Sequence, residues 1–494
     1  MKFVRLLEQA GFPACCSPDR EVEALCYDSR KAASDNAFVA LCGTVSDGHA
    51  FVQSAYDNGC RAFVVQRPVI LPSDADIVQV PDTRAALASL SACLFEHPAT
   101  RIKAIGITGT KGKTSVAHLI RHMLDETGHK AGLIGTTGIR FGDVVRKTVN
   151  TTPESYELQR ALSDMEKADC QYACVEVSSQ GLMTHRVDDL PFEIGIFTNL
   201  SPDHIGPREH SSFEEYMGWK AQLFRRCRIG ILNRDDAHFA DMTKDATCII
   251  RTFGMNDQAD YWADDVHLLR EPGFLGVGFT CHTPADSFPI RLPQPGRFSV
   301  YNALAAIGAG CELGIPLSQI ATVLAGAVIP GRIQLIPALP YCTIVVDYAH
   351  NELSLRSILT TLREYHPRRL ICLFGSVGGR TQLRRQTLAH AAAQLADFSI
   401  LTSDNPDFED PVAILEDIEQ GMSAAKGHFI SIPDRGDAIR YAVDMAKPGD
   451  MILLAGKGHE DYQLIRGERI PFCERDVVEE AARQRLSRES SGKS

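Results

Sequence analysis

The sequence predicts an α/β protein of three domains, and three observations lead to this fold class. The chain has 494 residues, which is enough for about three domains of ordinary size. Near residue 104 an apolar strand runs through a glycine-rich turn into a helix, which is typical of a P-loop-type domain with a parallel sheet. From residue 333 onward, short apolar strands alternate with amphipathic helices, which predicts a Rossmann-like sheet. We expect a small α/β domain over 1–100, the central P-loop-type domain over 101–332 and the Rossmann-like domain over 333–494.

Composition and charge place the protein in the cytoplasm. Hydrophobic residues make up 44% of the chain and charged residues 23%, which are ordinary globular values. The formal net charge of -11 argues against a general nucleic-acid or acidic-membrane surface. The 15 cysteines are scattered among apolar neighbours, which indicates reduced thiols. The N-terminus is too charged for a signal peptide, and no apolar run approaches membrane-spanning length. We expect a cytoplasmic monomer that binds no nucleic acid and does not insert into a membrane.

The N-terminal block alternates short apolar strands with helices. Strands are predicted at 37–42, 61–66 and 76–80, and helices at 49–58 and 83–96. Two polar loops, 27–31 and 43–49, carry hydroxyl, amide and charged groups that are able to grip a polar ligand. Asp-Ser and Ser-Asp-Gly are also ordinary turn formers, so composition alone favours simple turns at both places.

The glycine-rich turn after the strand at 104–107 predicts a phosphate cradle. Gly109 and Gly112 let the backbone bend and bring its N–H groups close to an anion. The N-terminus of the following helix adds partial positive charge and Lys113 adds a full one, while Thr114 offers a hydroxyl to Mg²⁺. The common phosphate-loop pattern has glycine at the position where this chain has Ile107.

Polar residues gather at the ends of two further strands, predicted at 172–177 and 194–197. Open α/β sheets bind ligands at these carboxyl ends, so Glu176 and His204 are candidate Mg²⁺ ligands beside Thr114. Magnesium prefers oxygen ligands, and His204 is equally well explained as a loop histidine that bonds to the backbone.

Lys220 lies in an amphipathic helix predicted over 213–224, and on the residues alone it is a solvated lysine. Strand-like alternation between 255 and 295 predicts a small β excursion, and a helix opens at Tyr301-Asn302-Ala303. Pro330-Gly331-Arg332 has the composition of a hinge.

The C-terminal pattern is regular. The predicted strands and helices alternate as 343–347, 353–365, 369–375, 383–396, 398–402, 411–423, 428–432, 435–446 and 451–456. Asp347-Tyr348-Ala349-His350-Asn351 follows the first strand in place of Gly-x-Gly-x-x-Gly, so we expect no dinucleotide site. The polar tail from about residue 483 is expected to fray.

The unusual glycine spacing of the turn points to a family. Residues 108–114, Thr-Gly-Thr-Lys-Gly-Lys-Thr, resemble the nucleotide loop of the Mur ligases, with Lys111 in place of the usual asparagine. Further segments resemble the branch of that family that adds the third peptide residue of the peptidoglycan precursor. In chain order they are Asp28-Ser29-Arg30, Asp47-Gly48, Thr151-Thr152-Pro153, Glu176-Val177-Ser178-Ser179, Thr198-Asn199-Leu200-Ser201, Asp203-His204, Asp347-Tyr348-Ala349-His350, Asp404-Asn405-Pro406 and 456–463. The resemblance covers nearly the whole chain.

The resemblance implies site residues at the matching positions. Those expected to meet the UDP-muramoyl-dipeptide are Ser29, Thr44, Val45, Ser46, Thr151, Thr152, Ser178 and Arg186. Those expected to meet ATP are Gly109, Thr110, Lys111, Gly112, Lys113, Thr114, Ser115, Asn302, Arg332 and Asp347. Those expected to meet the incoming amino acid are Arg380, Asp404, Asn405, Pro406, Asp407, Gly456 and Glu460.

The resemblance also implies a metal and a catalytic set. The expected Mg²⁺ ligands are Thr114, Glu176, His204 and Lys220 as a carbamate, which reverses the interpretation of Lys220 as solvated. A carbamate converts a cation into an oxygen ligand, which a Mg²⁺ site needs. The expected catalytic residues are Lys113, Glu176, His204 and Lys220.

The implied reaction has two steps. The γ-phosphoryl group of ATP passes to the D-glutamyl carboxylate of UDP-N-acetylmuramoyl-L-alanyl-D-glutamate, and an amine of the incoming amino acid then displaces phosphate from the acyl phosphate. Mg²⁺ and Lys113 neutralise charge on the transferring group, and closure about the hinge excludes water. The implied pathway is peptidoglycan synthesis, and with it cell-wall biogenesis, cell shape, cell division and the cell cycle.

The sequence favours L-lysine as the added amino acid, with meso-diaminopimelate or ornithine as the alternative. Diaminopimelate-adding enzymes resemble Asp-Asn-Pro-Arg in the specificity loop, where the arginine forks onto the second carboxylate. This chain has Asp407 there, and a carboxylate attracts an ammonium group rather than a carboxylate. Arg384 and Arg385 are near enough in sequence to replace the missing arginine, so the alternative stays open.

Two rival functions are weighed against this one. A folyl-polyglutamate type of amide ligase conflicts with Asp28-Ser29-Arg30 and with the N-terminal domain. A non-catalytic nucleotide-binding homologue conflicts with the intact set Lys113, Thr114, Glu176, His204 and Lys220.

Overall fold

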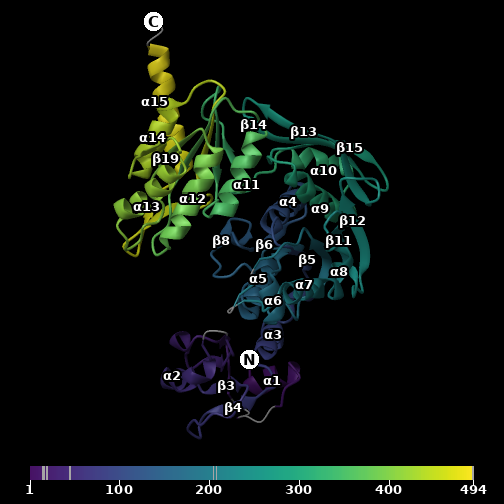
Figure 1. The fold of residues 1–494 in the computed structure, drawn as a ribbon. Coiled ribbons are helices and arrows are strands. Elements are labelled where there is room, and N and C mark those ends of the chain that lie inside the picture. Colours follow the sequence, from purple (N-terminus) through teal and green to yellow (C-terminus); the bar gives the residue numbers. More distant parts are fainter. Residues whose placement is uncertain (14–16, 18–19, 44–45, 204, 207–208, 492–494) are drawn as a thin grey trace. The chain divides into compact units, whose positions relative to one another are not determined.

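The computed structural model describes residues 1–13, 17, 20–43, 46–203, 205–206 and 209–491. The chain divides into two compact units. Unit 1 comprises Met1–Trp262, His282–Asp286 and Tyr301–Ile320, and unit 2 comprises Ala263–Cys281, Ser287–Val300 and Ala321–Ser494. The expected α/β class with three domains is confirmed, because unit 1 holds two separate sheets and unit 2 holds a Rossmann-like one (Figure 1). The exact domain boundaries stay a prediction.

The N-terminal sheet of unit 1 is small and entirely parallel. Its strands are β1 (Ala24–Cys26), β2 (Asn36–Val39), β3 (Ala62–Val65) and β4 (Asp76–Gln79). The helices α1 (Phe3–Gln9) and α3 (Thr83–Leu94) cover one face, and α2 (Val52–Asp57) covers the other. Both faces are buried because successive strand side chains point to opposite sides: Val39 and Val64 to the first, Phe38 and Phe63 to the second. This arrangement is why the strands read as continuous apolar runs.

The second sheet of unit 1 has the order β12-β11-β10-β5-β9-β6-β7-β8. It is parallel from β12 to β6, and β7 and β8 add an antiparallel edge. The strands are β5 (Lys103–Thr108), β6 (Ala131–Gly135), β7 (Gly138–Phe141), β8 (Val144–Arg146), β9 (Tyr172–Glu176), β10 (Phe192–Phe197), β11 (Cys227–Asn233) and β12 (Ile249–Gly254). The carboxyl ends of β5, β9 and β10 therefore lie side by side at one edge, as expected for a ligand site.

The helices that accompany this sheet carry the candidate residues. They are α4 (Lys113–Glu126), α5 (Ser155–Lys167), α6 (Ser179–Met183), α7 (Phe213–Ala221), α8 (Phe239–Thr243), α9 (Phe298–Glu312) and α10 (Leu317–Leu324). The short 3-10 turns of unit 1 are η1 (Ser29–Lys31), η2 (Gly48–Phe51), η3 (Pro98–Thr100) and η4 (Gln222–Arg225). The amphipathic helix expected over 213–224 is thus α7 continued by η4, and the helix expected from Tyr301 begins at Phe298.

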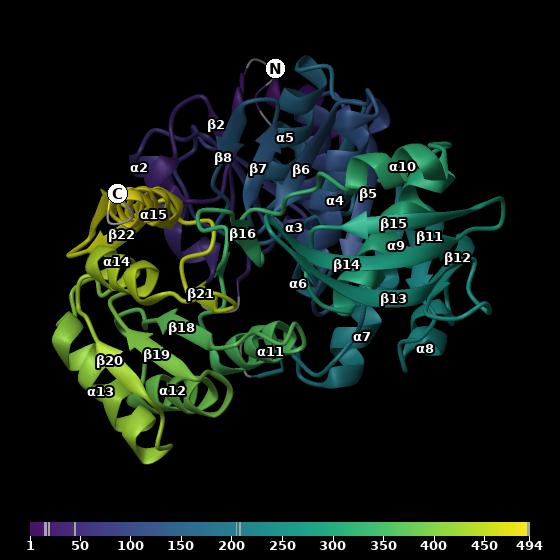
Figure 2. The same cartoon turned by 90° about the horizontal axis from the view of Figure 1, so that it is seen from above.

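The β excursion expected between 255 and 295 is present. It consists of β13 (Tyr261–Glu271), β14 (Phe274–His282) and β15 (Ser287–Leu292), which lie side by side (Figure 2). The alternation of buried and more exposed residues is clear in β15 and at the start of β13, whereas the middle of β14 is buried on both faces.

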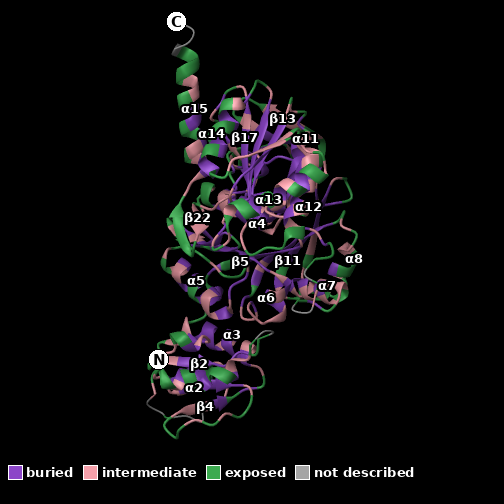
Figure 3. Cartoon of the chain, turned by 60° about the vertical axis from the view of Figure 1, so that its left-hand side comes forward, coloured by how far each residue is buried: buried purple, intermediate pink, exposed green. Residues whose placement is uncertain are grey.

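The Rossmann-like sheet of unit 2 has the order β16-β17-β21-β18-β19-β20. Its strands are β16 (Gln334–Ile336), β17 (Thr343–Asp347), β18 (Leu370–Phe374), β19 (Phe398–Leu401), β20 (Phe429–Ser431) and β21 (Met451–Ala455), and only β16 is antiparallel among their pairings. The helices α11 (Glu352–Arg363), α12 (Gln382–Leu395) and α13 (Pro411–Ala424) cover one face. The helices α14 (Arg435–Met445) and α15 (Glu474–Ser491) cover the other, and Figure 3 shows the strands buried between exposed helical faces.

Two C-terminal features differ from the expectations. A hairpin of β22 (Tyr462–Ile465) and β23 (Glu468–Pro471) follows the last strand and was not predicted. The tail expected to fray from residue 483 is helical to Ser491, because Val478, Ala481 and Ala482 anchor α15 on the sheet. Among the residues that the structure describes, no helix is long and apolar enough to cross a membrane.

Candidate active site

The phosphate loop, residues 109–114, joins β5 to α4 in unit 1. Gly109 and Gly112 have φ values of +145° and +87°, which side chains rarely adopt. A Cβ at Gly109 would lie 2.0 Å from Thr198 Oγ1, and one at Gly112 would lie 2.6 Å from Asn302 Oδ1. Glycine is therefore required at both positions, and the predicted nucleotide residue Asn302 lies directly against the loop.

The segment after β10 holds the loop in shape. Thr198 Oγ1 donates to Lys111 O at 2.7 Å, Asn199 O accepts from Thr110 N at 2.8 Å, and Asn199 Oδ1 accepts from Lys111 N at 3.0 Å. Thr198 and Asn199 belong to a segment that resembles the family, but they were not predicted as site residues. Their signal was a Thr-Asn pair directly after a buried strand, which places polar side chains at the ligand-binding edge.

Two lysine side chains converge on one carbonyl of this loop. Lys113 Nζ donates to Gly109 O at 2.8 Å and to Thr110 O at 3.1 Å, and Lys220 Nζ donates to Gly109 O at 2.9 Å. Lys220 is only 2% exposed, so it is not the solvated lysine that its sequence context indicated. Burial, together with the neighbouring Lys113, lowers the pKa of Lys220 well below its ordinary value. Two amines beside one backbone carbonyl form a site prepared for an anion.

Glu176, at the end of β9, supplies an oxygen ligand for a cation. Its Oε2 accepts a hydrogen bond from Thr114 Oγ1 at 2.9 Å, and its Oε1 accepts from Thr136 N at 2.9 Å. Burial raises the pKa of Glu176, and nearby Lys113 and the hydrogen bonds act against that shift. A buried carboxylate beside a threonine hydroxyl at the head of a helix fits the oxygen coordination of Mg²⁺. The other expected ligand, His204, lies outside the described residues.

The residues expected to meet the muramoyl-dipeptide form one network with the strand of Glu176. Thr152 Oγ1 donates to Glu176 O at 2.8 Å and accepts from Ser178 N at 2.9 Å. Arg186 Nη1 donates to Thr152 O at 2.9 Å, and its Nη2 pairs with Glu154 Oε1 at 2.9 Å. Arg186 Nε is buried and has no hydrogen-bond partner, so one guanidinium donor is left over. Thr151 lies nearby, with its hydroxyl 3.1 Å from that of Thr136.

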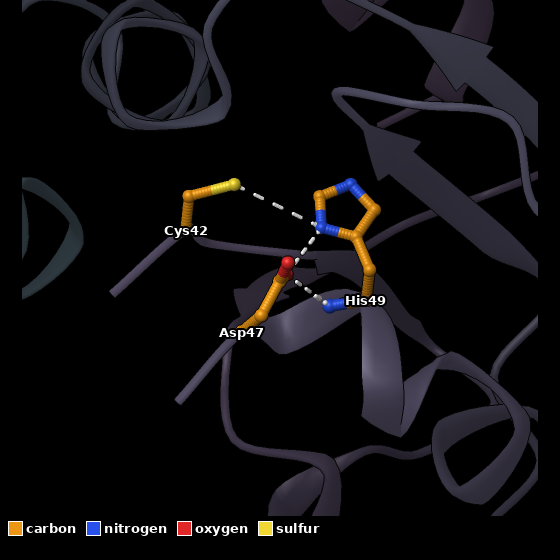
Figure 4. A group of neighbouring side chains, drawn as sticks. All are labelled: Cys42, Asp47 and His49. Carbon is orange, nitrogen blue, oxygen red and sulfur yellow. Dashed lines mark hydrogen bonds and ion pairs between the residues drawn. The ribbon is translucent and has the colours of Figure 1, made fainter. Parts of the chain in front are cut away.

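The N-terminal loop expected to meet UDP is described only in part, since Thr44 and Val45 lie outside the described residues. Ser46 O accepts from Gly43 N at 3.1 Å, and Ser29 begins η1 and is buried. Cys42, Asp47 and His49 gather beside this loop (Figure 4). His49 Nε2 accepts from Gln66 N at 2.8 Å, so the ring proton sits on Nδ1 and points at Asp47 Oδ1, 2.6 Å away. Both ring nitrogens are thus in use, and the group orders the loop rather than binding a metal.

Asp347, in unit 2, ends β17 and is fully engaged by backbone. Its Oδ2 accepts from Ile333 N and its Oδ1 from Ala349 N, both at 2.8 Å. Burial raises the pKa of Asp347, and the neighbouring Arg332 acts in the opposite direction. The two hydrogen bonds of Asp347 fix the chain on either side of it. The turn before it is held as well, because Gly331 O accepts a hydrogen bond from Tyr348 N at 3.0 Å.

Unit 2 brings most of the predicted amino-acid residues together. Asn405 Nδ2 donates to Glu460 Oε2 at 2.9 Å, and a Cβ at Gly456 would lie 2.6 Å from Asp404 Oδ2. Gly378 N donates to Asn405 O at 2.9 Å, so the loop that carries Arg380 lies beside this group.

Lys457 lies at the centre of this group and was not among the predicted site residues. It is fully buried and donates to Asn405 Oδ1 at 2.8 Å and to Glu460 Oε2 at 3.0 Å. The signal for it was a lysine between two glycines directly after the apolar strand β21.

Asp407 has a partner within the protein. Its Oδ1 accepts from Gly467 N at 2.8 Å, its N donates to Leu464 O, and its O accepts from Arg466 N. Asp407 has a φ of +52°, in the left-handed region that an aspartate tolerates better than most residues. This carboxylate therefore ties the loop to the β22–β23 hairpin, which the charge argument for L-lysine did not anticipate.

Arg384 and Arg385, the possible replacements for the arginine missing from the specificity loop, differ in whether they already pair with carboxylates. Arg385 is buried and is consumed by Glu409 Oε2 at 2.7 Å and Asp417 Oδ2 at 2.8 Å. Arg384 makes only a 3.3 Å hydrogen bond to His350 O and pairs with no carboxylate in the described part of the chain. Partial burial and the neighbouring Arg380 lower the pKa of Arg384. Arg380 and Arg384 thus lie near each other, and neither forms an ion pair with a carboxylate of the described residues.

Comparisons with known sequences cover almost the whole chain. Three family profiles match, described as "Mur ligase family, catalytic domain" over residues 21–93, "Mur ligase middle domain" over 107–310 and "Mur ligase, glutamate ligase domain" over 331–458. A protein of Caldanaerobacter subterraneus subsp. tengcongensis is 38% identical over 481 residues, which are 97% of this chain and 98% of the relative. One of Geobacillus thermodenitrificans is 38% identical over 499 residues, 98% of this chain and 100% of the relative. Both are named UDP-N-acetylmuramoyl-L-alanyl-D-glutamate--2,6-diaminopimelate ligase.

Solved structures that resemble this chain include a ligase of the same name. A structure described by that same ligase name superposes with a TM-score of 0.71 and 30% identity, covering 98% of this chain and 99% of the other. A folylpolyglutamate synthase of Mycobacterium tuberculosis superposes with a TM-score of 0.59 over 82% of this chain, at 16% identity, and shows a shared fold.

Proposed function

The chain belongs to the Mur ligase family, and from this premise we propose that it joins meso-diaminopimelate to the D-glutamate of UDP-N-acetylmuramoyl-L-alanyl-D-glutamate. Family membership makes it an ATP-dependent amide ligase of peptidoglycan synthesis, which serves cell-wall biogenesis, cell shape, cell division and the cell cycle. The observation that carries the proposal is the likeness over nearly the full length of both chains to relatives named for this reaction. We place the protein in the cytoplasm as a monomer.

The expected preference for L-lysine is not supported, and diaminopimelate, the stated alternative, fits better. The relatives carry 2,6-diaminopimelate in their names. The L-lysine argument needed the Asp407 carboxylate to face the substrate, whereas one of its oxygens accepts from Gly467 N. Arg380 and Arg384 supply cationic groups that pair with no carboxylate among the residues the structure describes, and such groups suit a substrate with two carboxylates.

In the proposed first step, unit 1 handles the phosphates of ATP. Lys113 moves from the carbonyls of Gly109 and Thr110 to the β- and γ-phosphates, and the N–H groups of the phosphate loop cradle the same oxygens. Thr114 and Glu176 would hold Mg²⁺, with His204 as the further expected ligand, and the bound ion would neutralise charge on the phosphoryl group. The network of Thr152, Ser178 and Arg186 orients the D-glutamyl carboxylate.

Lys220 is proposed to act as a carbamate. An amine must be neutral to add to carbon dioxide, and the lowered pKa of Lys220 favours that form. The side chain is buried beside the phosphate loop, and burial and the charge of Lys113 outweigh the opposing effect of Asp203 on its pKa. The resulting anionic oxygens would pair with the cations of this site.

In the second step one amino group of diaminopimelate, in its neutral form, attacks the acyl carbon, its proton passes to solvent and phosphate leaves, while the other amino group stays an ammonium. Glu460 and Asn405 orient the amino acid through its ammonium group, and Arg380 and Arg384 bind carboxylate. The nucleotide contacts that remain predictions are Asn302, Arg332 and Asp347. The UDP contacts that remain predictions are Ser29, Thr44, Val45 and Ser46.

The test is phosphate release with ATP, the UDP-muramoyl-dipeptide and single amino acids: meso-diaminopimelate, L-lysine and L-ornithine. We expect turnover with meso-diaminopimelate at a kcat/KM at least about tenfold above the others. Turnover with L-lysine alone would contradict the choice of substrate. ATP binding without phosphate release for any of the three would favour the non-catalytic homologue.

A further inference from the structure

Lys457 is a buried cation that the proposed reaction has not yet used. It follows β21 in the turn Gly456-Lys457-Gly458, where both glycines have positive φ values, +114° and +57°. A Cβ at Gly458 would lie 2.9 Å or less from the backbone of Tyr348, so the turn is pressed against its neighbour and the lysine points inward. Burying an ammonium group is costly unless it is paired and hydrogen-bonded, which makes its partners informative.

The partners of Lys457 are the residues expected to bind the amino acid. Its Nζ lies 2.8 Å from Asn405 Oδ1, 3.0 Å from Glu460 Oε2 and 3.6 Å from Asp404 Oδ1. The ring centroid of Tyr462 lies 5.6 Å from Nζ, so an aromatic face is a further neighbour of the ammonium group. Lys457 has no exposed surface, so a substrate in solution has no direct access to it.

These contacts fix the orientation of the Asn405 amide. Its Oδ1 accepts from Lys457 Nζ and, at 3.0 Å, from Leu464 N. An oxygen with two donors leaves the amide nitrogen to face Glu460 Oε2, and that distance is 2.9 Å.

The same contacts engage only one of the two carboxylate oxygens of Glu460. Its Oε2 accepts from both Lys457 and Asn405, whereas its Oε1 accepts no hydrogen bond from the described residues. Asp404 and Glu460 set two negative charges against the single positive charge of Lys457. These three side chains therefore include one more acidic than basic group, and Glu460 Oε1, which accepts no hydrogen bond from the described residues, is where a cation is received.

We propose that Lys457 is a positioning residue that locks Asn405 and Glu460 so that Glu460 Oε1 accepts the ammonium group of the incoming amino acid. Lys457 touches no substrate and acts through these two side chains. The inference rests on the proposed ligase function, because the ammonium group belongs to the amino-acid substrate of that reaction.

The experiment compares Lys457→Met, Lys457→Arg and Lys447→Met, an exposed lysine of the same unit, as full-length enzymes. We expect Lys457→Met to raise the KM for meso-diaminopimelate at least about tenfold and to leave the KM values for ATP and for the UDP-dipeptide within about twofold. Lys457→Arg keeps the charge and restores part of the loss, and Lys447→Met changes nothing. KM does not depend on the fraction of active protein, so partial misfolding leaves the test intact.

A double-variant cycle separates positioning from general damage. In the Glu460→Gln background, Lys457→Met should raise the KM by less than about threefold, because the group that it positions is already lost. Equal rises of all three KM values, or full additivity with Glu460→Gln, would overturn the proposal. Absence of phosphate release in the wild type with every amino acid would instead refute the proposed function.

Discussion

Lys220 in unit 1 and Lys457 in unit 2 are both nearly inaccessible, with exposures of 2% and 0%, yet their surroundings are opposite in charge. Lys220 meets a backbone carbonyl, the face of Tyr216 at 4.7 Å and the field of a second lysine. Lys457 meets two carboxylates and an amide oxygen. The surroundings of the first lower its pKa, whereas the second is held by hydrogen bonds and an ion pair to acidic and amide side chains. Burial alone therefore does not assign a role to a lysine, and its partners do.

The contrast extends to the regions around the two side chains. The phosphate loop collects amines and backbone N–H groups, which suits the phosphates of a nucleotide and an anionic carbamate. The Lys457 cluster carries an excess of negative charge, which suits an ammonium group, with Arg380 and Arg384 on the same unit for carboxylates. A reaction between a phosphorylated acid and a zwitterionic amine needs one region of each kind.

The largest expected effect on activity comes from removing Lys220, the lysine with the lowered pKa. Lys220→Ala should lower kcat by about 10²- to 10³-fold, because an oxygen ligand beside the transferring phosphoryl group is lost. Added short-chain carboxylates should restore part of the activity, which steady-state phosphate release measures. Lys244→Ala, an exposed lysine of unit 1, is the control. Full activity in plain Lys220→Ala would remove the carbamate from the account.

The next largest effect tests Glu460, one of the two carboxylates beside Lys457. Glu460→Gln should raise the KM for meso-diaminopimelate by tens of fold to about 100-fold, the cost of a lost charge-assisted hydrogen bond, with the KM for ATP unchanged. Initial rates at saturating ATP give the comparison, and Glu468→Gln on the exposed strand β23 is the matched control. A normal KM would show that the ammonium group binds elsewhere.

A smaller effect tests the arginine pair. Arg384→Gln should raise the KM for meso-diaminopimelate about tenfold and that for L-lysine less than about twofold, because only diaminopimelate has a second carboxylate. Parallel titrations with both amino acids measure the difference, and Arg440→Gln on the surface of α14 is the control. Equal losses with both substrates would assign Arg384 to the carboxylate that the two substrates share.

The smallest effect concerns stability. The folded-state pKa of Glu176 is raised by burial, so its contribution to stability is fully present below the unfolded pKa near 4.5 and is lost as pH rises through the folded value. At pH 8 in EDTA, Glu176→Gln should therefore melt about 2 °C or more above the wild type, and the difference should shrink toward pH 5. A thermal scan at both pH values measures it, and a lower Tm for the variant at pH 8 would contradict the raised pKa.

The sequence predicted the fold well where local pattern and packing agree. The strand at Thr343–Asp347 has the expected bounds, because its apolar run is buried on both faces between helices. The hairpin β22–β23 was missed because its residues are half-buried or exposed and carry no strong alternation. The helix α15 was not predicted, because its largely polar sequence conceals three anchoring residues.

The candidate site was predictable in its residue types and less so in its partners. The glycine spacing of the phosphate loop indicated the family. The structure explains this spacing, because a side chain at Gly109 would clash with Thr198 and one at Gly112 with Asn302. Asp407 was misleading, because its charge was visible in the sequence and its hydrogen bond to Gly467 N was not. Lys457 was overlooked for the same reason: its role depends on three-dimensional contacts with Asn405 and Glu460.

The choice of amino acid is tested most directly by competition. The enzyme is given ATP, the UDP-muramoyl-dipeptide and equal concentrations of meso-diaminopimelate, L-lysine and L-ornithine, and the UDP-tripeptide product is identified by its mass. Product ratios equal the ratios of kcat/KM, so no separate constants are needed. We expect the diaminopimelate tripeptide to make up at least about nine-tenths of the product. A product dominated by the lysyl tripeptide would contradict the account and return Asp407 to the role that its charge suggested.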